Sequence, residues 1–156
     1  MLSSSNCSYI LRMILPKHCY LLAVDTKDNR LKTFGLDRIT DIDISKTKYR
    51  EKYSYDFKAL FAQAFGILGD EGGKAQRVRL QFSYEQGQYV KTYPLHASQI
   101  IIEEDKNAVI IELFLYITYD FTKALLSFGQ ELEVLRPAKL RKSINQELSN
   151  ALKKYE

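Results

Sequence analysis

The stretch AVIIELFLYITYDFTKALLSFGQELEVLRPAKLR, residues 108–141, decides the fold, because strand and helix signals follow one another along it without a break. Its first ten residues, Ala108–Ile117, are apolar except for Glu112. They are rich in the β-branched and aromatic types that pack well in sheets. This composition predicts a central strand of a sheet.

The rest of this stretch predicts a helix, a strand and a second helix. Asp120 is a candidate N-cap for the first helix, and Gly129 is able to end that helix in the left-handed conformation. Leu132–Leu135 predicts a short strand. Pro137 then opens a last helix over Ala138–Tyr155, at a position where its missing N–H costs nothing.

Upstream of residue 108, the sequence predicts a strand, a helix and another strand over Ala75–Ser83, Tyr84–Lys91 and Ser98–Glu104. The first of these strands alternates cleanly, so one set of side chains faces the core and the other an open face. The core set is expected to be Val78, Leu80 and Phe82, joined by Leu113 and Leu115, and the open set Arg77, Arg79 and Gln81. The resulting order is β-α-β-β-α-β-α. We therefore expect a ferredoxin-like βαββαβ domain with an extra C-terminal helix, in which the first and third strands lie at the centre.

The front of the chain predicts four short strands separated by turn residues, which indicates a small twisted sheet or part of a β-barrel. These strands are Tyr9–Leu15, His18–Asp25, Leu31–Leu36 and Ile39–Ile44. A helix that begins near residue 57 follows, and the run Asp70–Gly73 is the best domain boundary. We predict an α+β chain in three parts: a partial β domain over 1–46, a helical linker over 47–74, and the ferredoxin-like domain over 75–156.

Composition sets broad limits on function. The 156 residues are 46% hydrophobic and 27% charged, which is typical of a globular protein. The net charge of +4 permits anionic partners without requiring them. Two cysteines, without a CxxC pair, predict neither a disulfide framework nor a zinc site. No window approaches the length of a membrane span, so we expect a cytoplasmic protein without a membrane partner.

The sequence does not predict an enzyme. It contains no nucleophile–base pair that stands out, and the GDEGG run at 69–73 lacks the Lys-Ser/Thr of a phosphate-binding P-loop. His96 is expected to make a local hydrogen bond rather than to bind a metal. We therefore expect no catalytic residue, no metal and no cofactor.

Four segments resemble a known family. YVKTYPLHASQ (89–99) and LLSFGQELEVLRPAKLRKSI (125–144) resemble the WCX extension that follows WYL domains in bacterial transcriptional regulators. CYLLAVD (19–25) and LKTFGLDRI (31–39) resemble the second half of a WYL domain. The tryptophan of the WYL name is replaced by Cys19, and only about four strands of that domain are present. The resemblance thus implies a partial SH3-like or Sm-like barrel at the front of the chain.

The resemblance also implies a ligand site and a function. In the family, the barrel is held to bind anionic effectors, nucleotides or single-stranded nucleic acid. Residue by residue, this role falls on Tyr20, Lys32 and Arg38. An arginine fork suits phosphate and a tyrosine ring suits stacking. The alternative is structural, with Arg38 paired to a nearby aspartate and Tyr20 in the core. The implied function is an effector-sensing and dimerising module that lacks its own helix-turn-helix.

A second candidate surface follows from the alternation alone. Arg77 and Arg79 are expected on the open face of the sheet, and the adjacent central strand exposes Glu112, Phe114 and Tyr116 beside them. Basic and aromatic residues on central strands are typical of sheets that stack RNA bases. An open face that carries Phe114 is more often covered by a neighbouring domain or a second subunit. Both possibilities remain open from the sequence.

Two expectations concern partners. Four strands do not close a small barrel, so the open edge favours a homodimer. Without a recognition helix, this chain alone is expected not to bind a specific duplex DNA site. The main alternative function is a purely structural oligomerisation or protein-interaction module without a ligand.

Overall fold

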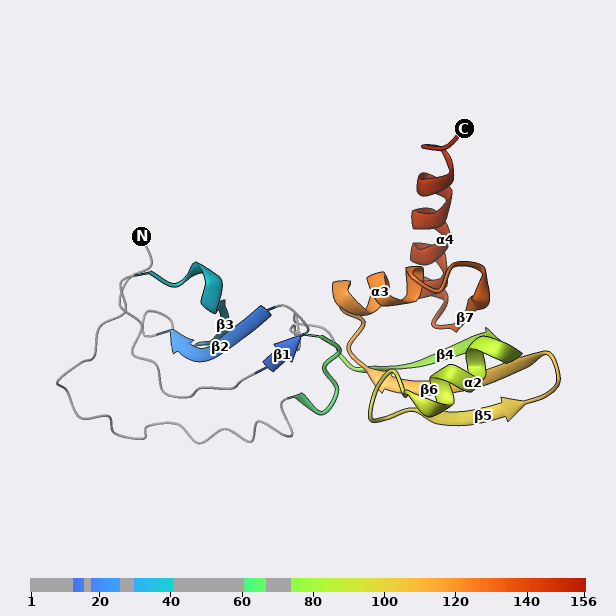
Figure 1. The fold of residues 1–156 in the computed structure, drawn as a ribbon, viewed down its shortest axis with the longest axis horizontal. Helices are drawn as coiled ribbons and strands as arrows, with labels where there is room; N and C mark the ends of the chain where they lie inside the picture. The colour runs from blue at the N-terminus through green and yellow to red at the C-terminus, as the bar shows by residue number, and fades with distance from the viewer. Residues whose placement is uncertain (1–12, 16–17, 26–29, 41–60, 67–73) are drawn as a thin grey trace. The chain divides into compact units, whose positions relative to one another are not determined.

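The computed structural model describes residues 13–15, 18–25, 30–40, 61–66 and 74–156 (Figure 1). The chain divides into two compact units, Met1–Asp56 and Phe57–Glu156. The division falls inside the segment 47–74 that the sequence predicts as a linker. The architecture is mixed α+β, with antiparallel sheets in both units.

The first unit contains an antiparallel sheet in the order β1-β2-β3. The strands are β1 (Met13–Leu15), β2 (His18–Asp25) and β3 (Arg30–Gly35), followed by a 3-10 turn η1 (Leu36–Arg38). As described, these three strands form an open sheet and not a closed barrel. The predicted strand at 39–44 is not seen at Ile39 and Thr40, and its remainder lies outside the described residues, as do residues 9–12 of the first predicted strand.

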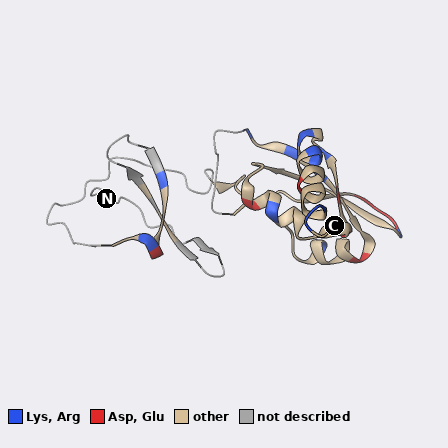
Figure 2. Ribbon diagram, turned by 90° about the horizontal axis from the view of Figure 1, so that it is seen from above, with Lys and Arg blue, Asp and Glu red and all other residues tan. Residues whose placement is uncertain are grey.

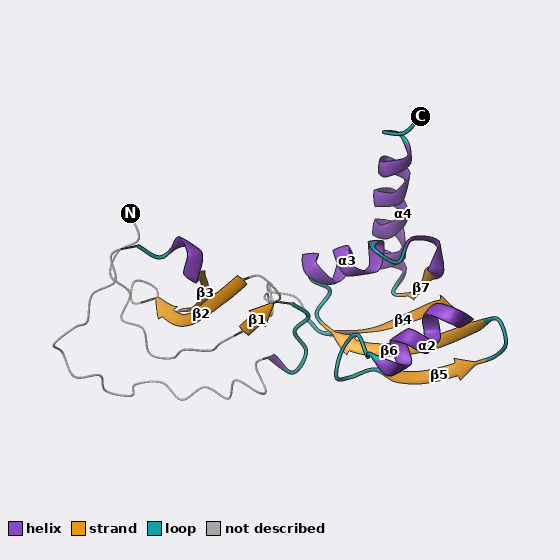
Figure 3. Cartoon of the chain, viewed as in Figure 1, coloured by secondary structure: helices purple, strands orange, loops and turns teal. Residues whose placement is uncertain are grey.

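The second unit is built on a four-stranded antiparallel sheet in the order β5-β6-β4-β7 (Figure 3). Its strands are β4 (Gln76–Ser83), β5 (Ile100–Glu104), β6 (Ala108–Leu115) and β7 (Leu132–Arg136). Its helices are α2 (Tyr84–Thr92), α3 (Tyr119–Leu126) and α4 (Ala138–Leu152). The prediction that the first and third of these strands lie at the centre of the sheet is confirmed.

One face of this sheet carries the core. Val78, Leu80 and Phe82 of β4 are fully buried, and so are the β6 residues Leu113 and Leu115, as the alternation predicts. Helices α2 and α3 cover this face, because their buried side chains Val90, Phe121 and Leu125 belong to the same cluster. The close approach of α2 requires a glycine at 87: a Cβ atom there would stand 2.4 Å from the Val109 side chain.

Two details of α3 differ from the sequence prediction. The N-cap is Thr118, whose Oγ1 accepts a hydrogen bond from the Phe121 N–H, and not Asp120. Threonine at this position satisfies an N–H group of the first turn that would otherwise have no partner. Gly129 has the expected positive φ of 56°, but α3 has already ended at Leu126 and Gly129 begins a short 3-10 turn.

Helix α4 is amphipathic, but only its first half is packed. Leu140 is buried and Ile144 is half-buried against the core cluster, whereas Leu148 and Leu152 are exposed. The helix ends at Leu152, three residues earlier than predicted.

Lysine and arginine occur on this helix and on several other elements of residues 74–156, and aspartate and glutamate lie among them (Figure 2).

The segment Phe61–Gly66 is tied to the end of β6. The carbonyl of Gln63 accepts a 2.8 Å hydrogen bond from the Tyr116 N–H, and the carbonyl of Phe65 accepts one from Thr118 Oγ1 at 3.2 Å. The Phe65 ring also meets the Phe121 ring edge to face at 5.0 Å. Tyr116, which the sequence predicts to be exposed on the open face, lies just beyond β6 and is half-buried. Its backbone N–H holds the segment 61–66.

Candidate functional site on the open sheet face

The face of the four-stranded sheet opposite the helices carries a polar cluster. The register pairs Arg79 with Glu112 and Arg77 with Phe114 on the two central strands. Because alternate residues of a strand point to opposite faces, these four side chains lie together on the face opposite the buried leucines. The structure therefore places Arg77, Arg79 and Phe114 as neighbours on one face.

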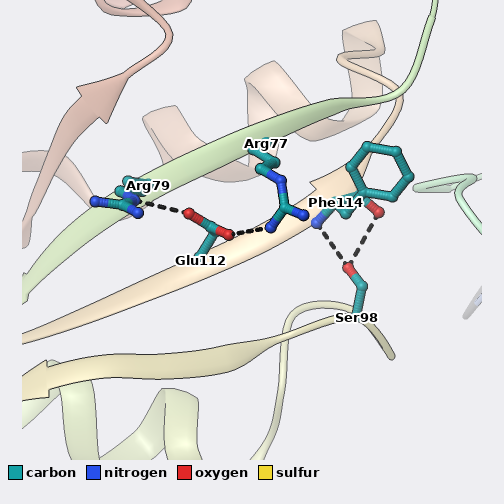
Figure 4. A network of polar contacts seen from close by, with 5 residues as sticks. All are labelled: Arg77, Arg79, Ser98, Glu112 and Phe114. Carbon is teal, nitrogen blue, oxygen red and sulfur yellow. Dashed lines mark hydrogen bonds and ion pairs between the residues drawn. The ribbon is translucent and has the colours of Figure 1, made fainter.

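Glu112 joins the two arginines (Figure 4). Its Oε1 accepts a hydrogen bond from Arg77 Nη1 at 2.6 Å, and its Oε2 accepts one from Arg79 Nε at 2.7 Å. The Glu112 side chain is only 7% exposed, whereas those of Arg79 and Arg77 are 41% and 74% exposed. The sequence predicted an exposed Glu112. The arginine side chains pair with its carboxylate instead, and the group is buried although it stands on the open face.

The electrostatics of the cluster follow from these contacts. Hydrogen bonds from Arg79 and then from Arg77 hold the pKa of Glu112 below its ordinary value. Partial desolvation opposes this effect but is the smaller influence. Glu112 is thus an anion at neutral pH, and the trio of side chains carries one net positive charge. Arg136 of β7 is the Cα partner of Arg79 and adds a further positive charge beside the trio.

Phe114 lies at the edge of this cluster and is 40% exposed. Its backbone is held by a residue that the sequence did not single out: Ser98 Oγ accepts from the Phe114 N–H at 2.8 Å and lies 3.1 Å from the Phe114 carbonyl oxygen (Figure 4). β5 begins at Ile100, two residues later than predicted. The Ser98 side chain therefore provides the pairing that a longer strand would have given to Phe114.

This arrangement has the chemical groups that an anion beside a flat apolar group would require. Each arginine uses part of its guanidinium on Glu112 and retains other N–H groups for a ligand. A carboxylate that fixes two guanidinium groups reduces the entropy that they would lose on binding. Phosphate is the chemical group that such forks match best. The exposed ring of Phe114 offers a surface on which a base could stack.

The ligand set implied by the family resemblance lies in the first unit and is only partly brought together. Tyr20 is the Cα partner of Gly35, and the Arg38 side chain folds back close to Gly35. Lys32 is three positions from Gly35 on the same strand, so it belongs to the opposite face of the sheet. Arg38 lies 3.9 Å from Asp37, and both side chains are well exposed.

His96 makes local hydrogen bonds, as the sequence predicts. Its Nδ1 accepts from the Ser98 N–H at 3.1 Å and lies 2.8 Å from Ser98 Oγ. Burial lowers the pKa of His96, and a hydrogen bond to the Ala64 backbone partly offsets this effect. The described residues contain no group of three or more histidine, cysteine or acidic side chains arranged to hold a metal. Within the same residues, no helix has the length and apolar character needed to cross a membrane.

Comparisons with known proteins place the second unit in a family. The profile of the WCX domain matches residues 74–152. No curated protein matches the chain. Among solved structures, the proteasome accessory factor B/C (PafBC) of Arthrobacter aurescens aligns over 81% of this chain with 16% identity and a TM-score of 0.34. The chain spans about a fifth of that protein, 19% of its length.

Proposed function

The chain belongs to the WCX domain family, and on this basis we propose that it is the effector-responsive, dimerising part of a WYL-type transcriptional regulator. The match of the WCX profile to residues 74–152 carries this proposal. It is supported by the CYLLAVD and LKTFGLDRI segments, which resemble a WYL domain and lie upstream of the matched region. A regulatory rather than a catalytic role agrees with this membership.

The finer architecture belongs to the same proposal. A ferredoxin-like domain orders its four strands with the first and third at the centre. The second unit supports this assignment with its strand order β5-β6-β4-β7, which is antiparallel throughout. Helix α2 connects β4 to β5 and helix α3 connects β6 to β7, as the fold requires. For the first unit we propose a partial SH3-like or Sm-like barrel, to which β1, β2 and β3 would contribute an antiparallel sheet.

The ligand that we propose is anionic: a nucleotide or single-stranded nucleic acid bound near Arg38. The Arg38 side chain is 73% exposed, and its ion pair with Asp37 is long, with 3.9 Å between Nε and Oδ1. An exposed pair of this kind contributes little to stability. The guanidinium is therefore available to phosphate at small cost, and Tyr20 on the adjacent strand provides an aromatic ring.

Titration of a fluorescein-labelled single-stranded oligonucleotide, and separately of a labelled nucleotide, tests this site. We expect Arg38→Ala to weaken binding at least about 10-fold, the loss of one charge-assisted contact. The control is Lys139→Ala, which removes an exposed cation from α4 in the second unit and is expected to leave binding unchanged. Unchanged binding by Arg38→Ala, with a native circular dichroism spectrum, would exclude the site at Arg38. Absence of binding by the wild type itself would support the purely structural alternative.

The open sheet face supports a second candidate, a binding site for single-stranded nucleic acid. The specific observation is that Glu112 fixes Arg77 and Arg79 beside the exposed ring of Phe114. Base stacking on an aromatic ring is worth about 1–3 kcal/mol per base. Phe114→Ala should then weaken oligonucleotide binding by roughly 5- to 150-fold. A steep fall in affinity with salt should accompany it. If Phe114→Ala binds as tightly as the wild type, this face is not the site.

A further inference from the structure

The two edges of the four-stranded sheet differ in how their backbone is protected. At the β7 edge, Arg141 of α4 donates a hydrogen bond to the Val134 carbonyl at 3.2 Å and pairs with Glu133 at 2.6 Å. Helix α4 thus covers part of that edge with its own polar groups. Among the described residues, β5 at the other edge pairs only with β6.

The β5 edge carries an uninterrupted apolar run. Ile100, Ile101 and Ile102 are 52%, 48% and 42% exposed. All five residues of the strand are exposed. An edge strand with exposed β-branched residues is a template for another strand, and proteins usually blunt such edges with charges or bulges. Here the blunting devices, a register shift between Ile101 and Glu103 and the two glutamates that end the strand, leave the three isoleucines open.

We infer that β5 is the surface on which a second copy of this chain pairs, strand to strand, around a two-fold axis at Ile101. This inference rests on the proposed dimerising function and assigns its contact. It joins the two four-stranded sheets into one continuous antiparallel sheet of the dimer. The same strand from a second copy fits this edge, because the sequence IIIEE is able to pair with itself in the antiparallel orientation without placing two glutamates opposite one another.

The charges select that orientation. In an antiparallel pair centred on Ile101, Ile101 faces its own copy and Ile100 faces Ile102, while Glu103 faces the neutral Gln99 of the partner. A parallel pair would place each glutamate opposite the same glutamate of the other copy, and like charges directly opposite one another are destabilising. A shift of the axis by one residue to Ile102 would place Ile101 opposite Glu103. Only the first register pairs apolar with apolar side chains and keeps the carboxylates apart.

The neighbouring contacts leave this edge accessible. Lys91 of α2 donates a 2.8 Å hydrogen bond to Glu104, so the Glu104 carboxylate points toward α2. The hydrogen bond from Lys91 lowers the pKa of Glu104, so that it stays charged and marks the end of the apolar run. Since Ile101 is the Cα partner of the buried Ile111, its side chain belongs to the helix-covered side of the sheet, where burial against a second copy extends the core.

Cysteine crosslinking of the full chain tests the register. In a background with Cys7→Ser and Cys19→Ser, single cysteines replace Ile100, Ile101 or Ile102, with Glu133→Cys on the β7 edge as the control. Cα atoms directly opposite in an antiparallel pair are about 4.5–5.5 Å apart, within the range of a disulfide. We expect mild oxidation to convert Ile101→Cys to a covalent dimer in the highest yield, and Glu133→Cys to remain monomeric on denaturing gels.

Sedimentation equilibrium provides an independent measurement. Ile101→Lys should raise the concentration at half-dissociation at least about 10-fold, because two copies of the new charge face one another at the axis. The matched control, Leu148→Lys, places the same charge on another exposed apolar residue, on α4. It should leave the mass unchanged.

Each outcome separates this inference from the proposal on which it rests. A wild-type monomer at high micromolar concentration would refute dimerisation itself and the β5 contact with it. A dimer that resists Ile101→Lys and gives no crosslink at 100–102 would overturn the β5 contact alone. Dissociation by Leu148→Lys only would assign the contact to α4. A crosslink peak at Ile102 rather than Ile101 would refute the register.

Discussion

The two faces of the four-stranded sheet use the same two central strands in different ways. On the helix-covered face, β4 and β6 bury apolar side chains completely, as with Leu80. On the other face, the same strands bury a carboxylate, Glu112, between two partly exposed arginines. The first face gains stability from area removed from water. The second gains little net stability from its ion pairs and provides instead a fixed arrangement of charge.

The largest expected effect lies on the helix-covered face. Leu80→Ala should lower the free energy of unfolding by about 2–5 kcal/mol, because it leaves a cavity in a site with no solvent exposure. The neighbouring Gln81→Ala, on the other face, should change it by less than about 0.5 kcal/mol. Urea denaturation followed by circular dichroism measures both. Similar losses for the two variants would contradict the distinction between the faces.

Ser98→Ala should have a smaller effect, which tests how the open face is kept in register. The substitution removes the Oγ atom that pairs with both backbone groups of Phe114, and should lower the free energy of unfolding by about 1 kcal/mol. Amide hydrogen exchange should quicken at Phe114 and not at Leu113. Ser127→Ala, which removes an exposed hydroxyl on a turn, is the control. Unchanged exchange at Phe114 would show that the side chain adds nothing to the backbone pairing.

Ser98 also shows where prediction from sequence ends. Alternation places Val78, Leu80 and Phe82 in the core because a strand with one buried face shows period two, and the structure agrees. The sequence also predicts that β5 begins at Ser98, whereas the strand begins at Ile100. Periodicity alone does not show that a side chain, here that of Ser98, takes the place of a backbone partner. Strand boundaries are therefore less well specified than strand faces.

The site was predictable to a similar depth. Alternation alone brings Arg77, Arg79 and Phe114 to one face. It does not reveal that Glu112 is buried between the arginines, since this depends on side-chain rotamers and on the exact register of β4 with β6. The N-cap of α3 is a similar case. Thr118 and Asp120 are both suitable cap residues, and only the path of the chain after β6 selects Thr118.

A change of pH tests the contribution of the open face to stability, because Glu112 is a titratable group and the buried core residues of the other face are not. The pKa of Glu112 is lowered in the folded chain, so its pairing stabilises the fold above the unfolded-state pKa, and this stability is lost as pH falls from roughly pH 5 through the folded-state pKa. Between pH 7 and pH 4, the melting temperature of the wild type should therefore fall further than that of Glu112→Gln. The control Glu85→Gln removes an exposed carboxylate from α2. Parallel profiles for wild type and Glu112→Gln would contradict this.

The smallest expected effect distinguishes the two arginines within the open face. Arg79 should hold the Glu112 carboxylate charged more strongly than Arg77 does, because its hydrogen bond is the larger influence on the Glu112 pKa and its side chain is 41% exposed, against 74% for Arg77. Solvent screens the more exposed partner more effectively. Arg79→Ala should therefore raise the Glu112 pKa further than Arg77→Ala, which is measurable by the carboxyl carbon shift of Glu112 in an NMR titration. If the two variants raise it equally, the cluster is symmetric, and neither arginine is more available than the other for an anionic ligand. If Arg77→Ala has the smaller effect, Arg77 is the arginine that can leave Glu112 at least cost, and the contribution of the open face to ligand binding should be sought there first.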